Sequence, residues 1–186
     1  NCFLLLMKKD IERILEVPEG VNVSFEGESV KVSGNGKELE RNFGFRKIKM
    51  EMKEGKVFIT SKNATKNESK LAGTAEGHIK NMMQGIGEDF VYKLEIANVH
   101  FPMTVKIEGN IITIKNFLGE KVDRVSKILP DVKVDIKGMN VEVSSFNKES
   151  AGQTAANLES ATKVKGRDRR VFQDGIFITE KAGRAI

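Results

Sequence analysis

The sequence predicts an α+β protein of two tandem, duplicated domains, each an antiparallel sheet packed with one helix. Three observations lead there: apolar and polar residues alternate over many short segments, a helical spacing replaces that alternation twice, and the whole pattern occurs twice. Alternation with a period of two is typical of strands with one buried face, whereas apolar residues three and four apart are typical of a helix. With 39% hydrophobic residues, the 186-residue chain can build such cores.

The duplication is visible in the sequence letters. Residues 23–32 read VSFEGESVKV and residues 105–114 read VKIEGNIITI, and segment 48–61 corresponds in the same way to segment 132–145. Each copy is predicted to contain about four short strands followed by one helix. Glycine or asparagine between the alternating runs predicts hairpin turns, because these residues accept positive φ. We expect such turns at Gly27, Asn35–Gly36, Gly109–Asn110 and Gly138–Asn140.

The helical spacing covers residues 71–86 in the first copy and residues 151–162 in the second. The faces predicted to be buried are Leu71, Ala75, Ile79, Met82, Met83 and Ile86 in the first helix, and Ala151, Ala155, Leu158 and Thr162 in the second. Ser150 and Gln153 have the spacing of a capping box at the start of the second helix. Gly73 and Gly152 occupy matching positions, and we interpret the missing side chain as room for each helix to lie close to its sheet.

The repeat predicts an N-terminal domain (7–87), a C-terminal domain that ends in an arm of basic residues (88–178) and a tail (179–186). Residues 1–6 lack the charge pattern of a secretory signal, and we interpret them as an upstream extension that precedes Met7. No apolar run approaches the roughly 20 residues that span a membrane. Cys2, the sole cysteine, has no partner for an intramolecular disulfide. The cytoplasm is therefore the predicted compartment, and no membrane partner is expected.

The positive charge is concentrated near the C-terminus. Residues 163–186 carry seven Lys and Arg against three acidic residues, so they hold +4 of the formal net charge of +5. Such a cluster binds polyanions, because each Lys or Arg that meets a phosphate releases condensed counterions. The candidate RNA-binding residues are Lys163, Lys165, Gly166, Arg167, Arg169, Arg170, Gln173, Asp174 and Gly175.

The residues after this cluster indicate how it is held. Val171, Phe172, Ile176 and Phe177 surround a turn, which predicts that the arm folds against its domain with Phe172 as an anchor. Gly166 would allow close backbone approach to RNA, and arginine can stack on unpaired bases. A solvated, disordered terminus is the alternative.

A second, weaker basic cluster precedes the first helix. Lys62, Lys66 and Lys70 form a possible secondary RNA contact, with plain solvation as the alternative.

Few residues suggest catalysis. His78 and His100 have neither a cysteine nor a second histidine at ligand spacing, so they are predicted to be structural or surface residues, and no metal or cofactor is expected. The segment Gly34–Lys37 superficially resembles a phosphate loop, but it lies between two predicted strands, which favours a hairpin. The sequence therefore predicts a binding protein with no small-molecule substrate, and an enzyme acting on RNA is the alternative.

Two long motifs carry a family resemblance. Segment 72–86 (AGTAEGHIKNMMQGI), with Tyr92–Ile96 and His100–Val105, resembles the helix and linker of the large-subunit ribosomal protein L6 family in its archaeal and eukaryotic form. Segment 165–176 (KGRDRRVFQDGI) is similar to that family's C-terminal signature. The resemblance extends over about residues 7 to 183, including the duplication.

The resemblance implies a non-catalytic constituent of the cytoplasmic ribosome. It implies docking of the C-terminal domain on large-subunit rRNA, near the sarcin–ricin loop and the base of the stalk. Neighbouring large-subunit proteins would then be partners, and translational GTPases would bind nearby. The contacts would be made by Lys163, Lys165, Arg167, Arg169 and Arg170, with Gln173, Asp174 and Gly175 shaping the turn. A non-ribosomal module that pairs exposed sheet edges with protein partners is the other reading.

Overall fold

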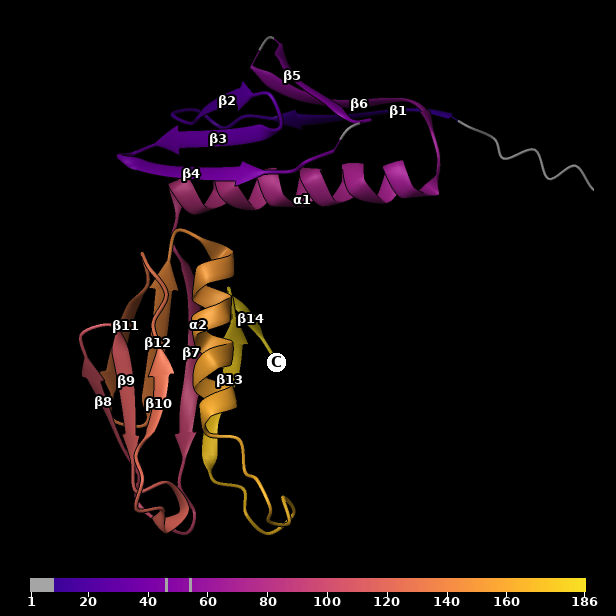
Figure 1. Cartoon of the computed structure of the whole chain (residues 1–186). Coiled ribbons are helices and arrows are strands. Elements are labelled where there is room, and N and C mark those ends of the chain that lie inside the picture. Colours follow the sequence, from indigo (N-terminus) through magenta and orange to yellow (C-terminus); the bar gives the residue numbers. More distant parts are fainter. Residues whose placement is uncertain (1–8, 46, 54) are drawn as a thin grey trace, which may run out of the picture. The chain divides into compact units, whose positions relative to one another are not determined.

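The computed structural model describes residues 9–45, 47–53 and 55–186, and the predicted upstream extension lies outside them. The described residues form two compact units, which divide between Glu88 and Asp89 (Figure 1). Both combine antiparallel sheets with one long helix, which confirms the predicted α+β class. None of the helices in the described ranges has the length and apolarity needed to cross a membrane.

The first unit contains two three-stranded sheets and the helix α1 (Lys66–Gly87). The sheet orders are β1-β6-β5 and β2-β3-β4, and every pairing is antiparallel. The strands are β1 (Lys9–Glu16), β2 (Asn22–Glu26), β3 (Ser29–Gly34), β4 (Lys37–Asn42), β5 (Lys49–Lys53) and β6 (Lys56–Ala64).

Helix α1 begins at a capping box that sequence analysis did not identify. The Thr65 side chain accepts a hydrogen bond from the backbone of Asn67, and the Glu68 carboxylate accepts one from the Thr65 N–H at 2.9 Å. The predicted buried face is confirmed except at its start, where Leu71 is 39% exposed and Ala72 is buried instead.

The second unit contains helix α2 (Lys148–Ala161), a short 3₁₀ turn η1 (Phe117–Gly119) and two sheets. The sheet orders are β10-β9-β8 and β11-β12-β7-β13-β14. The strands are β7 (Phe90–Ala97), β8 (Thr104–Glu108), β9 (Ile111–Lys115), β10 (Arg124–Lys127), β11 (Lys133–Lys137), β12 (Asn140–Ser145), β13 (Gly175–Lys181) and β14 (Arg184–Ala185).

The two units repeat one topology, which confirms the predicted duplication. Strands β1 to β6 with α1 correspond in order to β7 to β12 with α2, and the sheet orders β1-β6-β5 and β7-β12-β11 match. Each repeat therefore has six strands in the described part of the chain, more than the four or so predicted. Some strands, such as β4 (KELERN) and β10 (RVSK), are rich in charged residues, so their alternation is weak in the sequence. The second unit adds β13 and β14 after its helix.

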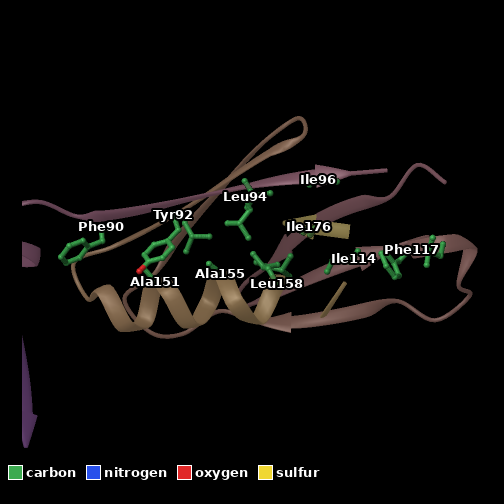
Figure 2. Close-up of a cluster of buried hydrophobic side chains, with 14 residues drawn as sticks. Phe90, Tyr92, Leu94, Ile96, Ile114, Phe117, Ala151, Ala155, Leu158 and Ile176 are labelled. Carbon is green, nitrogen blue, oxygen red and sulfur yellow. The ribbon is translucent and has the colours of Figure 1, made fainter. Parts of the chain in front are cut away.

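The core of the second unit lies between its sheets and α2 (Figure 2). Tyr92, Leu94 and Ile96 of β7 are buried against α2 residues that include Ala155 and Leu158. The other buried members of this core are Phe90, Ile112, Ile114, Phe117, Leu118, Val141, Val143, Ala151 and Ile176.

The two matching glycines differ in their surroundings. A Cβ on Gly152 would lie 3.1 Å from the Tyr92 hydroxyl oxygen, so glycine here allows the close approach of helix and sheet that was predicted. A Cβ on Gly73 would find its nearest neighbours in the Arg13 guanidinium at 3.7 Å or more, which is ordinary contact. The packing interpretation therefore holds for Gly152 and is wrong for Gly73.

Two local predictions for the second unit were wrong. Helix α2 begins earlier than expected because Asn147 is its N-cap and accepts from the Glu149 N–H at 3.0 Å. Gln153 lies inside the helix and donates to Asn157, so the predicted capping box of Ser150 and Gln153 does not form. The residues predicted as a tail, 179–186, instead contain the end of β13 and strand β14.

The predicted hairpin between β3 and β4 is confirmed. Its two central residues, Asn35 and Gly36, have φ of 49° and 72°, as a type I′ turn requires. The segment is therefore not a phosphate loop, because the strand β4 follows it, whereas a helix follows a phosphate loop.

Candidate nucleic-acid interface

The basic cluster forms a loop, residues 163–174, that joins α2 to β13 and that we call the basic arm (Figure 1). Both of its ends meet at Thr162, which is only 2% exposed. The Thr162 hydroxyl accepts a hydrogen bond from the Ile176 N–H at 2.9 Å. The arm is thus closed at its base and is not the disordered terminus considered as an alternative.

The far end of the arm is anchored by Asp174, which is 2% exposed. Its carboxylate accepts from the backbone N–H groups of Val99 and, at 3.0 Å, His100, and it lies 2.7 Å from His100 Nδ1. Burial raises the pKa of the Asp174 carboxyl, but the hydrogen bonds from His100 and Val99 outweigh burial and leave the pKa below its usual value. Asp174 is therefore held as an ion inside the domain.

The near end of the arm is anchored by Arg124 of β10. Its Nη1 donates to the carbonyl oxygens of Ala161 and Lys163, both at 2.9 Å, and its guanidinium lies 4.2 Å from the centroid of the Phe117 ring. The hydrogen bond from Arg124 lowers the pKa of Glu120, assisted by the nearby charges of Arg124 and of the arm's own cations, against the opposing effect of burial. The last carbonyl of α2 and the first carbonyl of the arm thus share a charged partner.

The interior of the arm is ordered by its own backbone. The Asp168 carbonyl accepts from the N–H groups of Val171 at 3.2 Å and Phe172 at 3.0 Å, and the Asp168 carboxylate accepts from the Arg170 N–H at 2.9 Å. Gly166 has φ of 69°, a region that L side chains rarely adopt. The carboxylate of Asp168, which lies among the arm's cations, therefore stabilises the arm's own backbone.

Phe172 is the predicted anchor, and the structure supports this role. Its half-buried ring packs against the core of the second unit, with the His100 ring centroid 5.1 Å away and the Arg167 Cζ 4.9 Å from its centroid. Val171 and Phe177, which the same pattern included, are exposed at 58% and 41%.

The structure brings the predicted cations together and separates them from two other predicted residues. Lys163, Lys165, Arg167, Arg169 and Arg170 are all exposed on the arm. Gln173 is also exposed and donates through Nε2 to the Arg170 carbonyl at 3.2 Å. Asp174 and Gly175 are buried, so they shape the end of the arm and are not exposed at its surface.

A groove of about 650 Å³ lies beside the arm. Its walls come from the C-terminal end of α2, the arm, the end of β7 and the start of β13. Among its lining residues are Glu159, Lys163, Arg169 and Phe177. The groove is bordered by two of the arm's cations and by one of its exposed aromatic neighbours.

The second basic cluster lies in the first unit. Lys62 is on β6, and Lys66 and Lys70 are in the first turns of α1, so the cluster is not confined to the loop before the helix as predicted. All three side chains are exposed. Cations near a helix N-terminus oppose the helix dipole, so helix stability does not account for Lys66 and Lys70.

Sequence reasoning missed two supporting residues. His100 was predicted to be structural or on the surface, but its pairing with Asp174 across 74 positions had no local signal. Arg124 was not predicted as a supporting residue, since its contact with Ala161 spans 37 positions. Among the residues that the structure describes, no three His, Cys, Asp or Glu side chains gather in a way that could hold a metal ion.

The fold and the site define a class: a duplicated α+β protein that presents a folded cationic loop. A family model described as Ribosomal protein L6 matches residues 17–89 and 101–175. The large ribosomal subunit protein uL6 of Methanococcus vannielii is 47% identical over 176 residues, which is 95% of this chain and 97% of that protein. The protein of the same name from Methanosarcina mazei is 45% identical over 95% of this chain and 100% of its own length. The one from Aeropyrum pernix is 47% identical over 94% and 98%.

The chain therefore belongs to the ribosomal protein L6 family, as its motifs indicated. The family model matches each of the two repeats separately, in agreement with the duplicated topology. Membership in a family of ribosomal components agrees with the prediction that the protein is not an enzyme.

Proposed function

We propose that the protein is a structural constituent of the large ribosomal subunit and that it binds large-subunit rRNA through the basic arm. The relatives are named for that subunit. The observation that carries RNA binding is the geometry of the arm. Five exposed cations stand on one loop whose two ends are held by hydrogen bonds to the body of the domain.

This geometry favours recognition of RNA by shape and charge. A loop that is already folded loses less conformational entropy on binding than a free tail does. Its Lys and Arg side chains can neutralise phosphates that a folded RNA brings close together, and contacts of this kind position a protein without reading base edges. The sheets of the second unit then serve as the base on which the arm is presented.

The family resemblance supports a finer proposal for location. The C-terminal unit would dock near the sarcin–ricin loop and the base of the stalk of a cytoplasmic ribosome, beside neighbouring ribosomal proteins and close to where translational GTPases bind. Lys62, Lys66 and Lys70 would form a secondary RNA contact, supported by their exposure.

Salt-dependent binding tests the arm. The triple variant Arg167→Ala, Arg169→Ala, Arg170→Ala is compared with wild type on a large-subunit rRNA fragment over a series of salt concentrations. We expect at least about a tenfold loss of affinity. The slope of log affinity against log salt concentration should become shallower by about two to three, because each lost phosphate contact removes nearly one unit. A control variant removes the same amount of charge elsewhere, by substituting alanine for Lys106, Lys127 and Lys133, exposed on β8, β10 and β11.

The outcome separates the candidates. If both variants change affinity and slope equally, binding depends on net charge and the arm is not the site. Co-sedimentation with large subunits in high salt addresses the alternative of a non-ribosomal protein module, which would leave the protein in the supernatant.

A further inference from the structure

We infer that the groove beside the basic arm holds one unpaired ribonucleotide of the bound RNA, with its base against Phe177 and its phosphate at Lys163 and Arg169. This inference rests on the proposed function, since it assigns a place to a nucleotide of the RNA that the arm binds. The volume of about 650 Å³ lies within the range of roughly 300–1,000 Å³ typical of sites for small molecules.

Phe177 is placed as a stacking surface and not as a core residue. Its neighbour Ile176 is fully buried, whereas Phe177 points to the other face of the sheet and is 41% exposed. A Cβ on Gly175 would lie 3.0 Å from the ring of Phe177, so the ring lies directly over the glycine backbone. The glycine thus leaves room for the ring to lie against the strand. Proteins bind unpaired bases by stacking them on aromatic rings held in this manner.

The other aromatic ring of the groove is already occupied. Arg167 and the His100 ring both lie against Phe172, and the rest of that ring packs on the core. Phe177 is therefore the ring that offers a face to a ligand.

Charge determines how a nucleotide would be oriented. Lys163 and Arg169 line the groove from the arm, whereas the acidic residue Glu159 lines it from α2. The other acidic lining residue, Asp174, is buried, and its carboxylate is already bound by His100 and Val99. A phosphate is favoured on the arm side, which directs the base toward the sheet and the helix end.

The nucleotide has to be unpaired. Bases inside an A-form helix are stacked between their neighbours, and their faces are not available to a protein ring. A base turned out of a loop or bulge exposes both faces. The arm would then neutralise the phosphates of the flanking RNA while the groove takes the extruded nucleotide.

The test compares two probes with equal numbers of phosphates. One is a hexamer of riboadenosine, and the other is the same hexamer with every base replaced by hydrogen at the sugar. For the full chain at moderate salt we expect about tenfold tighter binding of the hexamer with bases. Phe177→Ala should abolish that preference while leaving the affinity for the abasic probe and its salt slope unchanged. Phe177→Tyr should keep the preference, because it retains the aromatic face.

Further measurements keep the result unambiguous. Phe177→Leu retains apolar bulk without an aromatic face, so a full base preference in this variant overturns the stacking inference. Thermal unfolding shows whether each variant is folded. If Phe177→Ala does not fold, the test uses Phe177→Tyr. Loss of the base preference in a folded Phe177→Tyr variant overturns the inference. A polyglutamate decamer that competes for the groove as well as the riboadenosine hexamer would assign it to acidic peptides and also overturn it.

The two proposals fail in different ways. If the triple arm variant binds both probes as tightly as wild type, the proposed function of the arm fails. If that variant weakens both probes but Phe177→Ala keeps the base preference, the arm stands and only the groove inference is wrong.

Discussion

The hydroxyl of Thr162 accepts a hydrogen bond from the Ile176 N–H at 2.9 Å, although 14 positions separate the two residues. This contact joins the last turn of α2 to the first part of β13 and closes the base of the basic arm. The cations are therefore carried by a loop of defined shape, because both ends of the loop meet at one buried residue.

Thr162→Val tests this closure. The substitution keeps the shape but removes the acceptor, so the buried Ile176 N–H is left without a partner at a cost of about 1–3 kcal/mol in the free energy of unfolding. Urea unfolding of the full chain measures the loss, and hydrogen exchange of the Ile176 amide should become faster. Thr179→Val is the matched control, since Thr179 lies on β13, the strand of Ile176, and is exposed. An equal effect of both variants would show that closure at Thr162 has no special role.

Asp174 should make the free energy of unfolding of the second unit depend on pH in the acidic range. Its pKa is below the ordinary value of 3.8, so the unfolded state binds the proton more tightly than the folded state does. The stabilisation by Asp174 is then fully present above pH 3.8, the ordinary pKa, and is lost as the pH falls through the lower pKa of the folded state.

Comparison of wild type with Asp174→Asn over a pH series measures this contribution. The asparagine variant should be less stable above about pH 5, by about 1–3 kcal/mol, because the ionic hydrogen bonds to His100 and Val99 are weakened. The difference should shrink below pH 3.8. A difference that stays constant down to pH 2 would contradict the assignment.

Arg124 should control both the start of the arm and the titration of Glu120. Arg124→Ala leaves the carbonyl oxygens of Ala161 and Lys163 without their charged donor, which should cost about 1–3 kcal/mol of stability. Because the hydrogen bond from Arg124 is the main cause of the lowered pKa of Glu120, that pKa should rise toward its ordinary value of 4.5. NMR titration of the Glu120 carboxyl checks the shift, and Arg184→Ala, an exposed arginine on β14, should leave it unchanged.

The two matching glycines should respond differently to alanine. Gly73→Ala adds a methyl group at ordinary contact distance and should stabilise α1 by about 0.5–1 kcal/mol, the usual gain in helix propensity. Gly152→Ala places its methyl group 3.1 Å from the Tyr92 hydroxyl oxygen. Movement of Tyr92 should reduce or reverse that gain. Urea unfolding of both variants measures the difference, and an equal gain at the two positions would refute the packing argument.

Much of the fold could be predicted from residue patterns. Asn35–Gly36 predicts a hairpin because these two residue types accept the positive φ of the turn. Ile79 and Leu158 mark buried helix faces because burial along a helix follows a local period in the sequence. Short strands rich in charge, such as β10 (RVSK), were harder, since only the pairing of β10 with β9 holds it in a sheet. The start of α2 was missed because Asn147 and Ser150 are both acceptable N-caps and only the fold selects between them.

By itself the sequence determined the duplication, the alternation of strands with one helix per repeat, and the position of the positive charge. These depend on residue type and short spacing, and both are written along the chain. The tertiary structure decided that the charged segment is a closed loop, that Asp174 is turned inward to His100, and that Phe177 faces the groove. These depend on contacts such as those made 14 and 74 positions apart, and no local pattern records which distant residues the folded backbone brings together.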